Sequence, residues 1–394
     1  MSGNGANRQD WPGRAALRPT AKATPGHSRV HNLSLVLSCL FHGGPMSRAE
    51  LARATGLTRV TISDLVAGLS DQGLIVDLGT SPEPRVGKPA SLIDINAAGH
   101  LIAVLDLSDT SQMRGALITL RGEVLRRAER PAVGATGAAV VHLASGLAQE
   151  LIPAAKDARL LGVGVASPGV LTPDGTVVYA KDYQWENLPL AEQIASTTGA
   201  AVYAANDANL RALAEFTFAG ASAQGLMEVS LTDGLGAGIL LDGMLLAGPS
   251  NAAGEIGHIP AMAGGEPCTC GRTGCLETVL NRRVLGGEEA SPGGENGGSV
   301  GSFTLSPATL ERVGQSTAAV LGPIVSALNL SDLVFADPRG VATPEVISAI
   351  RQGLEERILP QIMADLDVRV SQLGADAALL GAGALVLAEQ LGLT

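Results

Sequence analysis

The stretch EIGHIPAMAGGEPCTCGRTGCLE, residues 255–277, contains three of the four cysteines of this chain and one of its six histidines. Four of its side chains follow the spacing H-x9-C-x-C-x4-C; they are His258, Cys268, Cys270 and Cys275. Three thiolates and one imidazole complete the tetrahedral ligand set that Zn²⁺ prefers, with no position left open for a substrate. We therefore expect a structural rather than a catalytic zinc. The alternative is a set of unrelated buried thiols, which the close spacing disfavours.

The length and composition are those of a globular protein. The chain has 394 residues, enough for two or three domains, of which 46% are hydrophobic and 16% charged. By inspection no apolar run is long enough to span a bilayer, and the first residues do not resemble a signal segment. The cysteines, three of them clustered, do not look like a secreted disulfide framework. These features predict a cytoplasmic protein with no membrane partner.

Charge is divided unevenly along the chain. Residues 1–95 contain ten Lys and Arg against seven Asp and Glu, a net +3, and the remaining residues contribute −14, which gives −11 overall. Only the N-terminal part is therefore electrostatically compatible with nucleic acid. The alternative is a charged tail, since four of the ten cations precede residue 27.

The distribution of apolar residues predicts an α/β protein with a duplicated core. Residues 1–27 are rich in Gly, Pro, Ala and Arg and predict a disordered tail, and residues 286–302 predict a glycine-rich loop. Residues 98–250 alternate short Val, Leu and Ile runs with helical stretches. A strand–turn–strand–turn–strand pattern starts at Leu101 and again at Leu226. Such an internal repeat indicates two α/β lobes with a cleft between them.

The N-terminal part has the pattern of a helix-turn-helix. Ser47 and Glu50 form a capping box, so a helix begins there. Gly56 and Leu57 form a turn, and Thr58 caps a second helix. The following segment, residues 73–96, reads as a two-stranded wing. The alternative is a helical hairpin that packs on a protein partner.

In such a motif the start of the second helix enters the major groove, and wing cations reach phosphates or the minor groove. The expected DNA contacts are Ser47, Thr58, Arg59, Thr61, Ser63, and at the wing tip Arg85 and Lys88. Asp64 is an acid on the same helix, and it either faces away from DNA or discriminates among bases.

Three segments carry a resemblance to a known family. GEIGH at 254–258 followed by CTCGRTGCLE at 268–277 resembles the signature of the ROK family (repressor, open reading frame, kinase), and VGVASPG at 163–169 and Asn-Asp-Ala-Asn at 206–209 resemble two further family segments. The family comprises sugar kinases and sugar-responsive repressors on a two-lobed, actin-like ATPase fold. The resemblance covers residues 28–394, including the winged helix of the repressor branch.

The resemblance implies domains and a sugar site. It implies a winged helix-turn-helix at 28–97, a first lobe at 98–205 plus 378–394, and a second lobe at 206–377 with the zinc loop and a dimerisation surface. The implied sugar-binding residues are Asn206, Asp207, Glu255, His258 and Glu277. In this arrangement His258 would bind zinc through one ring nitrogen and a sugar hydroxyl through the other. The alternative is that the two glutamates are solvated surface acids.

The nucleotide elements of the kinases are altered in this chain. The family pattern Asp-x-Gly-x-Thr is here 106–110, with Ser108 in place of glycine and an added Asp109, whose carboxylate would repel phosphate. The pattern Gly-Thr-Gly-x-Gly is here 232–236, Thr-Asp-Gly-Leu-Gly, and a Gly-Gly pair is replaced by Ala-Asp-Pro at 336–338. We therefore expect neither ATP binding nor catalysis, although Asp207 matches the general base of the kinases.

Together these features predict a repressor of carbohydrate metabolism genes. As a homodimer or dimer of dimers, it would bind a palindromic operator and leave it when a sugar or sugar derivative binds between the lobes. The first alternative is a ROK-type sugar kinase, an ATP-dependent phosphotransferase, with an attached DNA-binding domain. The second is a constitutive DNA-binding protein whose effector pocket is dead.

Overall fold

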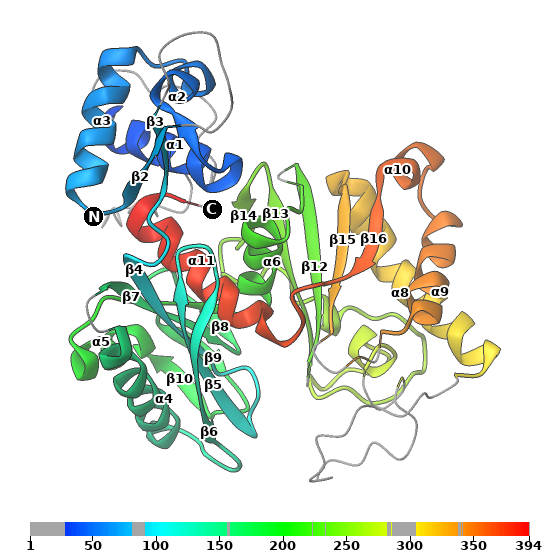
Figure 1. The fold of residues 1–394 in the computed structure, drawn as a ribbon. Helices are drawn as coiled ribbons and strands as arrows, with labels where there is room; N and C mark the ends of the chain where they lie inside the picture. Colours follow the sequence, from blue (N-terminus) through cyan, green and yellow to red (C-terminus); the bar gives the residue numbers. More distant parts are fainter. Residues whose placement is uncertain are drawn as a thin grey trace, which may run out of the picture.

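The chain forms an N-terminal helical unit and two sheet-based lobes (Figure 1). The computed structural model describes residues 28–80, 91–155, 158–222, 224–232, 234–281, 285, 305–337, 340 and 342–393. The predicted tail, the wing tip with Arg85 and Lys88, and the glycine-rich loop lie outside these ranges. The N-terminal unit contains α1 (Ser28–Gly43), β1 (Met46–Ser47), α2 (Arg48–Thr55), α3 (Arg59–Asp71), β2 (Ile75–Thr80) and β3 (Ser91–Ile95).

The predicted helix-turn-helix is confirmed in detail. Ser47 and Glu50 form the capping box of α2, which ends at Gly56 with a positive φ of 68°. The Thr58 hydroxyl accepts the Thr61 amide at the start of α3. The predicted inward positions of α3 are its buried residues, Ile62, Leu65, Val66 and Leu69. The wing strands β2 and β3 pair antiparallel, and β1 adds a third strand.

The first lobe is a five-stranded sheet in the order β11-β7-β4-β5-β6. Its strands are β4 (His100–Asp106), β5 (Gln112–Thr119), β6 (Val124–Pro131), β7 (Arg159–Ser167) and β11 (Val202–Asn206). The predicted meander from Leu101 is β4 to β6, paired antiparallel, whereas β7 and β11 continue the sheet in parallel. Also in this lobe are α4 (Ala138–Leu151), α5 (Leu190–Thr198), and a small sheet of β8 (Val170–Leu171), β9 (Val177–Ala180) and β10 (Trp185–Leu188).

The second sheet repeats this order as β14-β13-β12-β15-β16. Its strands are β12 (Gly225–Leu231), β13 (Leu235–Leu241), β14 (Met244–Leu245), β15 (Asp332–Ala336) and β16 (Asp367–Val370). The predicted meander from Leu226 is β12 to β14, and β12, β15 and β16 run parallel. The helices of this lobe include α8 (Pro307–Leu328), α9 (Pro344–Glu355) and α10 (Pro360–Asp365). The duplication that the sequence predicts is thus confirmed strand by strand.

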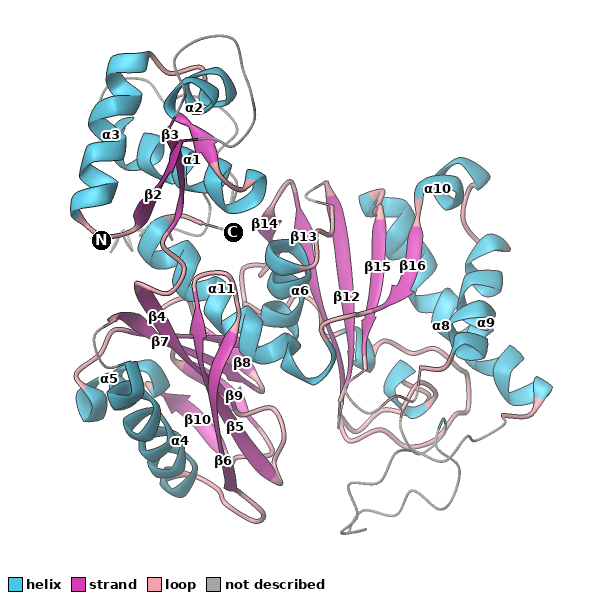
Figure 2. Cartoon of the chain, in the orientation of Figure 1, coloured by secondary structure: helices cyan, strands magenta, loops and turns pink. Residues whose placement is uncertain are grey.

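Two helices lie between the sheets, α6 (Asp207–Phe218) and α11 (Ala377–Leu391) (Figure 2). Alternating strand residues explain this layering, because successive side chains of a strand face opposite sides. In β12, Leu226 belongs to the central core with α6 and α11, whereas Met227 faces the outer core with α8 and α9. The central core also contains Val36 and Leu40 of α1, so the N-terminal unit packs on the same apolar mass.

Two helical stretches are long and apolar enough to cross a membrane, Ala138–Ala155 and Gly374–Leu391. The expectation from the sequence, that no run is long enough, was therefore wrong as a statement about length and composition. Both stretches are about half buried inside the protein, at 44% and 50%, and their helices pack on the first sheet. Their apolar character therefore has an explanation in the core.

Candidate functional site

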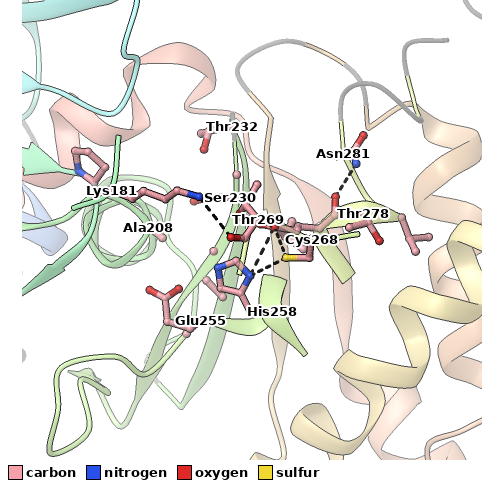
Figure 3. Close-up of a pocket in the computed structure, with 18 of the residues that line it drawn as sticks. Lys181, Ala208, Ser230, Thr232, Glu255, His258, Cys268, Thr269, Thr278 and Asn281 are labelled. Atoms are coloured by element: carbon pink, nitrogen blue, oxygen red, sulfur yellow. Dashed lines mark hydrogen bonds and ion pairs between the residues drawn. The ribbon is translucent and has the colours of Figure 1, made fainter. Parts of the chain in front are cut away.

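A cleft of about 1630 Å³ opens between the two lobes. Ser108 and Gly169 line it from the first lobe, and Ser230 and Thr309 line it from the second. Lys181 reaches across it, because its amino group donates to the Thr269 carbonyl at 3.4 Å (Figure 3). The cleft is larger than a typical small-molecule pocket.

The predicted zinc ligands come together. One donor atom from each of His258, Cys268, Cys270 and Cys275 lies within 4.8 Å of the other three. The Cys268 sulfur is 3.5 Å from His258 Nδ1, and the Cys270 and Cys275 sulfurs are 3.7 Å apart. A tetrahedral ion with Zn–S bonds of about 2.3 Å needs ligand separations of about 3.7 Å. The donor set therefore fits zinc in both chemistry and spacing.

The loop that holds this cluster depends on backbone turns that a side chain would block. Gly274 has a φ of +68°, and a Cβ there would lie 1.8 Å from the Met262 carbonyl oxygen. Isolated bridges between Pro260 and Cys275 and between Pro267 and Thr273 close the loop on itself. Glycine is the residue that permits this close backbone approach.

The cluster forms one wall of the cleft. His258 directs Nδ1 toward Cys268, as Figure 3 shows, which leaves Nε2 as its remaining polar atom. Glu277 lies against the cluster, since its Oε1 accepts from the Cys268 thiol at 2.8 Å and is 3.6 Å from His258 Nδ1. Glu255 lines the cleft, and partial desolvation there raises the pKa of its carboxyl while His258 opposes that rise.

The opposite wall is built at the start of α6. The Asn206 side chain caps the helix, because its Oδ1 accepts the amides of Ala208 and Asn209 and its Nδ2 donates to the Gly169 carbonyl. Asp207 follows as the first helical residue and also lines the cleft. All five predicted sugar-binding residues thus line one cleft.

Arg211 is a buried cation that the sequence analysis missed. Its side chain is 3% exposed and pairs with Asp207, with Nη1 2.5 Å from Oδ2. Its Nη2 also donates to the Ser108 hydroxyl at 3.0 Å, which links α6 to the β4–β5 turn. Burial raises the pKa of Asp207, and the Arg211 charge opposes that rise. The i, i+4 spacing within Asn-Asp-Ala-Asn-Leu-Arg was the available signal.

The β4–β5 turn, whose Ser108 and Thr110 line the cleft, contains two acids that are already satisfied. Asp106 accepts both the amide and the hydroxyl of Ser108 and pairs with Arg114. Asp109 accepts the amide and hydroxyl of Ser111. Among the other altered nucleotide elements, the Asp337 carboxylate accepts the Ala342 amide, whereas residues 233 and 338 lie outside the described ranges.

The DNA-binding candidates occupy two environments. Arg59 and Ser63 are exposed on α3, whereas the hydroxyls of Thr58 and Thr61 bond to each other at the helix cap. Ser47 is only 5% exposed and is engaged by Glu50 through both its amide and its hydroxyl. The structure therefore gives Ser47 a capping role and speaks against its predicted contact with DNA.

Helix α6 connects the cleft with the N-terminal unit. Its first residue, Asp207, is in the cleft, and its last, Phe218, packs edge-on against Phe41 of α1, with ring centroids 6.2 Å apart. Arg121 reinforces this junction, because it donates to the Phe41 carbonyl at 3.0 Å and pairs with Asp94 of β3 at 2.7 Å. A motion of α6 would therefore act directly on α1.

Comparison with known proteins agrees with this architecture. The ROK family model matches residues 109–389, and the model of bacterial regulatory proteins of the crp family matches residues 45–75. The chain is 26% identical to a xylose repressor of Caldicellulosiruptor bescii, over 91% of this chain and 96% of that protein. It is 28% identical to a glucokinase of Halalkalibacterium halodurans, over 73% of this chain and 94% of that protein.

Solved structures give the same result. A ROK family transcriptional regulator, described as a homolog of the E. coli MLC protein, aligns with a TM-score of 0.75 and 25% identity, over 93% of this chain and 97% of that one. A ROK hexokinase from Thermus thermophilus aligns with a TM-score of 0.58 and 24% identity, over 73% of this chain and 98% of that one. Since the family model covers more than half of its length, the chain belongs to the ROK family.

Proposed function

We propose that this protein is a sugar-responsive DNA-binding repressor of carbohydrate metabolism genes. The observation that carries the proposal is helix α6, which has the polar cleft at one end and the helix-turn-helix unit at the other. Relatives named xylose repressor and N-acetylglucosamine repressor support a monosaccharide or a derivative as the ligand. The likeness to the xylose repressor extends over 91% of this chain, against 73% for the glucokinase, and the crp-family model matches residues 45–75.

The polar residues of the cleft suit a polyol. A buried hydroxyl needs a hydrogen-bond partner, and Asp207, Glu255 and His258 supply carboxylate and imidazole acceptors. We assign Asn206 and Glu277 to the same site. We also propose the domain boundaries that the sequence predicts. A bound zinc would be held by His258 and the three cysteines and would fix the loop that carries His258.

Sugar can affect DNA binding only if it prefers one arrangement of the two lobes. A sugar that draws Asp207 toward the zinc-loop wall would move α6 and, through Phe218, the position of α1. In a homodimer, or a dimer of dimers, on a palindromic operator, such a shift would change the spacing of the two α3 helices. We further propose that the protein is cytoplasmic and has no membrane partner.

The test combines DNA release with an uncoupling variant. Full-length protein on an operator selected from a randomised duplex is titrated with D-xylose, D-glucose and N-acetylglucosamine, and binding is followed by fluorescence anisotropy. We expect one sugar to release the DNA, and Phe218→Ala to bind the same sugar but release DNA less, by roughly three- to tenfold, since an aromatic pair contributes about 0.5–1.5 kcal/mol. Phe218→Leu, which keeps the apolar volume, is the control. Sugar binding with unchanged DNA affinity in the unmodified protein would disprove the coupling.

A sugar kinase with an attached DNA-binding domain is the second candidate, because Asp106 and Asp207 are both present and a glucokinase is among the relatives. We favour the repressor because Arg211 already neutralises Asp207, and because Asp106 and Asp109 are engaged in their own turn. Sugar-dependent ATP consumption that disappears in Asp207→Asn would establish the kinase instead.

A further inference from the structure

The exposed face of α3 combines a cation, an apolar residue and an acid in its N-terminal half. The exposed residues of its first turns are Arg59, Val60, Ser63, Asp64 and Ala67, which lie on one side of the helix. This set is called the reading face below. The opposite side is the apolar side that packs into the N-terminal unit. The reading face is therefore the side that the motif presents to a major groove.

Besides Arg59, two residues of the reading face are free to contact a base. Val60 is 72% exposed in the first turn. Asp64 is exposed one turn later, and within the described part of the chain its carboxylate has no ion-pair or hydrogen-bond partner. In contrast, the Ser63 hydroxyl donates to the Arg59 carbonyl of its own helix at 2.9 Å. Apart from the Arg59 guanidinium, the free groups are thus one apolar and one anionic, and neither of these two suits a phosphate.

The major groove offers partners for both. Thymine presents a C5-methyl group, which apolar side chains contact, and cytosine presents an N4 amino group, which donates to carboxylates. An aspartate in a groove lined by phosphates is repelled unless it accepts such a hydrogen bond. Adenine also presents an amino group, but its neighbouring N7 acceptor repels a carboxylate, so aspartate favours cytosine. We infer that Val60 and Asp64 are specificity-determining residues that read a thymine and a cytosine in each operator half-site. This inference rests on the proposed DNA-binding function.

The helix geometry sets the spacing of the two bases. Residues four apart rise about 6 Å along a helix, and stacked bases are about 3.4 Å apart on one strand. Val60 and Asp64 would therefore read bases about two positions apart. Arg59, which precedes them at the helix start, supplies the nearby cation for a phosphate or a guanine.

The experiment begins with selection of binding sites from a randomised duplex by the full-length protein. The enriched site is then remade with deoxyuridine at each thymine in turn, which removes only the methyl group. We expect one such replacement per half-site to weaken binding by the unmodified protein about fourfold, the value of one buried methyl-sized group. Val60→Ala should bind the two duplexes almost equally. Val30→Ala, which changes a valine on α1 that is 75% exposed, should keep the full difference.

The selected base in the Asp64→Asn variant distinguishes base reading from a structural role, because a structural role would not change that base. Asparagine pairs with adenine rather than cytosine, so the selected base should change from cytosine to adenine at one position, with about a tenfold or greater change in preference. Asp71→Asn removes the same charge from the last turn of α3 and should strengthen binding to all duplexes without changing the selected base.

The outcomes separate the two proposals. If the unmodified protein enriches no sequence, the DNA-binding function fails and this inference fails with it. If a site is enriched but Val60→Ala retains the deoxyuridine effect and Asp64→Asn retains the cytosine preference, the base assignment is wrong while DNA binding stands.

Discussion

The two ends of the cleft use the same kinds of side chain in opposite ways. At the zinc-loop end, Glu255 and His258 line the cavity with polar atoms directed at it (Figure 3). At the β4–β5 end, Asp106 and Asp109 accept hydrogen bonds from serines of their own turn. Carboxylates that are satisfied internally repel phosphate and offer nothing to a metal–nucleotide complex. The two regions therefore differ in what their carboxylates face, which is the cleft for Glu255 and their own turn for Asp106 and Asp109.

The largest expected effect comes from removing a zinc ligand. Cys275→Ser removes one of the four ligands and should abolish zinc binding. The effect should be large, because structural zinc contributes about 10–16 kcal/mol to the folding of small domains. We expect about one zinc per chain by elemental analysis in the unmodified protein, and none in the variant. Sugar binding should then fall more than about 100-fold, since the loop that carries His258 loses its anchor. Cys39→Ser, which changes the cysteine of α1, should have the zinc content and affinity of the unmodified protein.

Arg211 tests whether the two ends are linked through a buried charge. Arg211→Met should lower the free energy of unfolding by about 3–5 kcal/mol, because it leaves Asp207 buried without its partner. Urea denaturation measures the change. Arg127→Met, which breaks the more exposed pair with Asp376, should cost less than about 1 kcal/mol. Equal losses in the two variants would mean that the Arg211 pair is not desolvated. Asp207→Asn combined with Arg211→Met should recover part of the loss.

The smallest expected effect is the pH dependence of sugar affinity, which distinguishes Asp207 from Asp109 of the β4–β5 turn. Burial raises the pKa of Asp207, so the protonated form gains weight as pH falls from 7. Sugar affinity should therefore decrease toward low pH, because the neutral carboxyl is the poorer hydroxyl acceptor. The charged groups around it are Arg211, Asp106 and Glu255, and the pKa of Glu255 is raised as well.

Calorimetry between pH 5 and 8 would measure this dependence. Asp207→Asn should bind about 10–100-fold more weakly at pH 7, as expected for loss of a charged hydrogen bond, and with a flatter pH profile. The profile that remains belongs to Glu255, which Glu255→Gln should remove. Asp109→Asn at the opposite end should leave both affinity and profile unchanged. A pH profile altered by Asp109→Asn would contradict the division of the cleft.

The helix-turn-helix and the two meanders were predictable because their signals are local. A capping box at Ser47 and Glu50, a turn at Gly56 and an apolar period in α3 involve neighbours within a few residues. The candidate metal ligands were predictable for the same reason, since all four lie within residues 258–275. The candidate site residues Asn206 and Asp207 came instead from a resemblance, and both of them line the cleft.

The sequence alone therefore determined the elements, the strand duplication and the donor chemistry, because backbone propensity and metal-ligand preference act over short distances. Only the tertiary structure decided which charges meet. Arg211 is 103 residues from Ser108, and Phe218 is far in sequence from Phe41, yet both pairs are in contact. Packing of α6 against the shared core brings these residues together. The pattern of residues along the sequence does not specify that packing. The link between the cleft and the DNA-binding unit is thus a property of the fold.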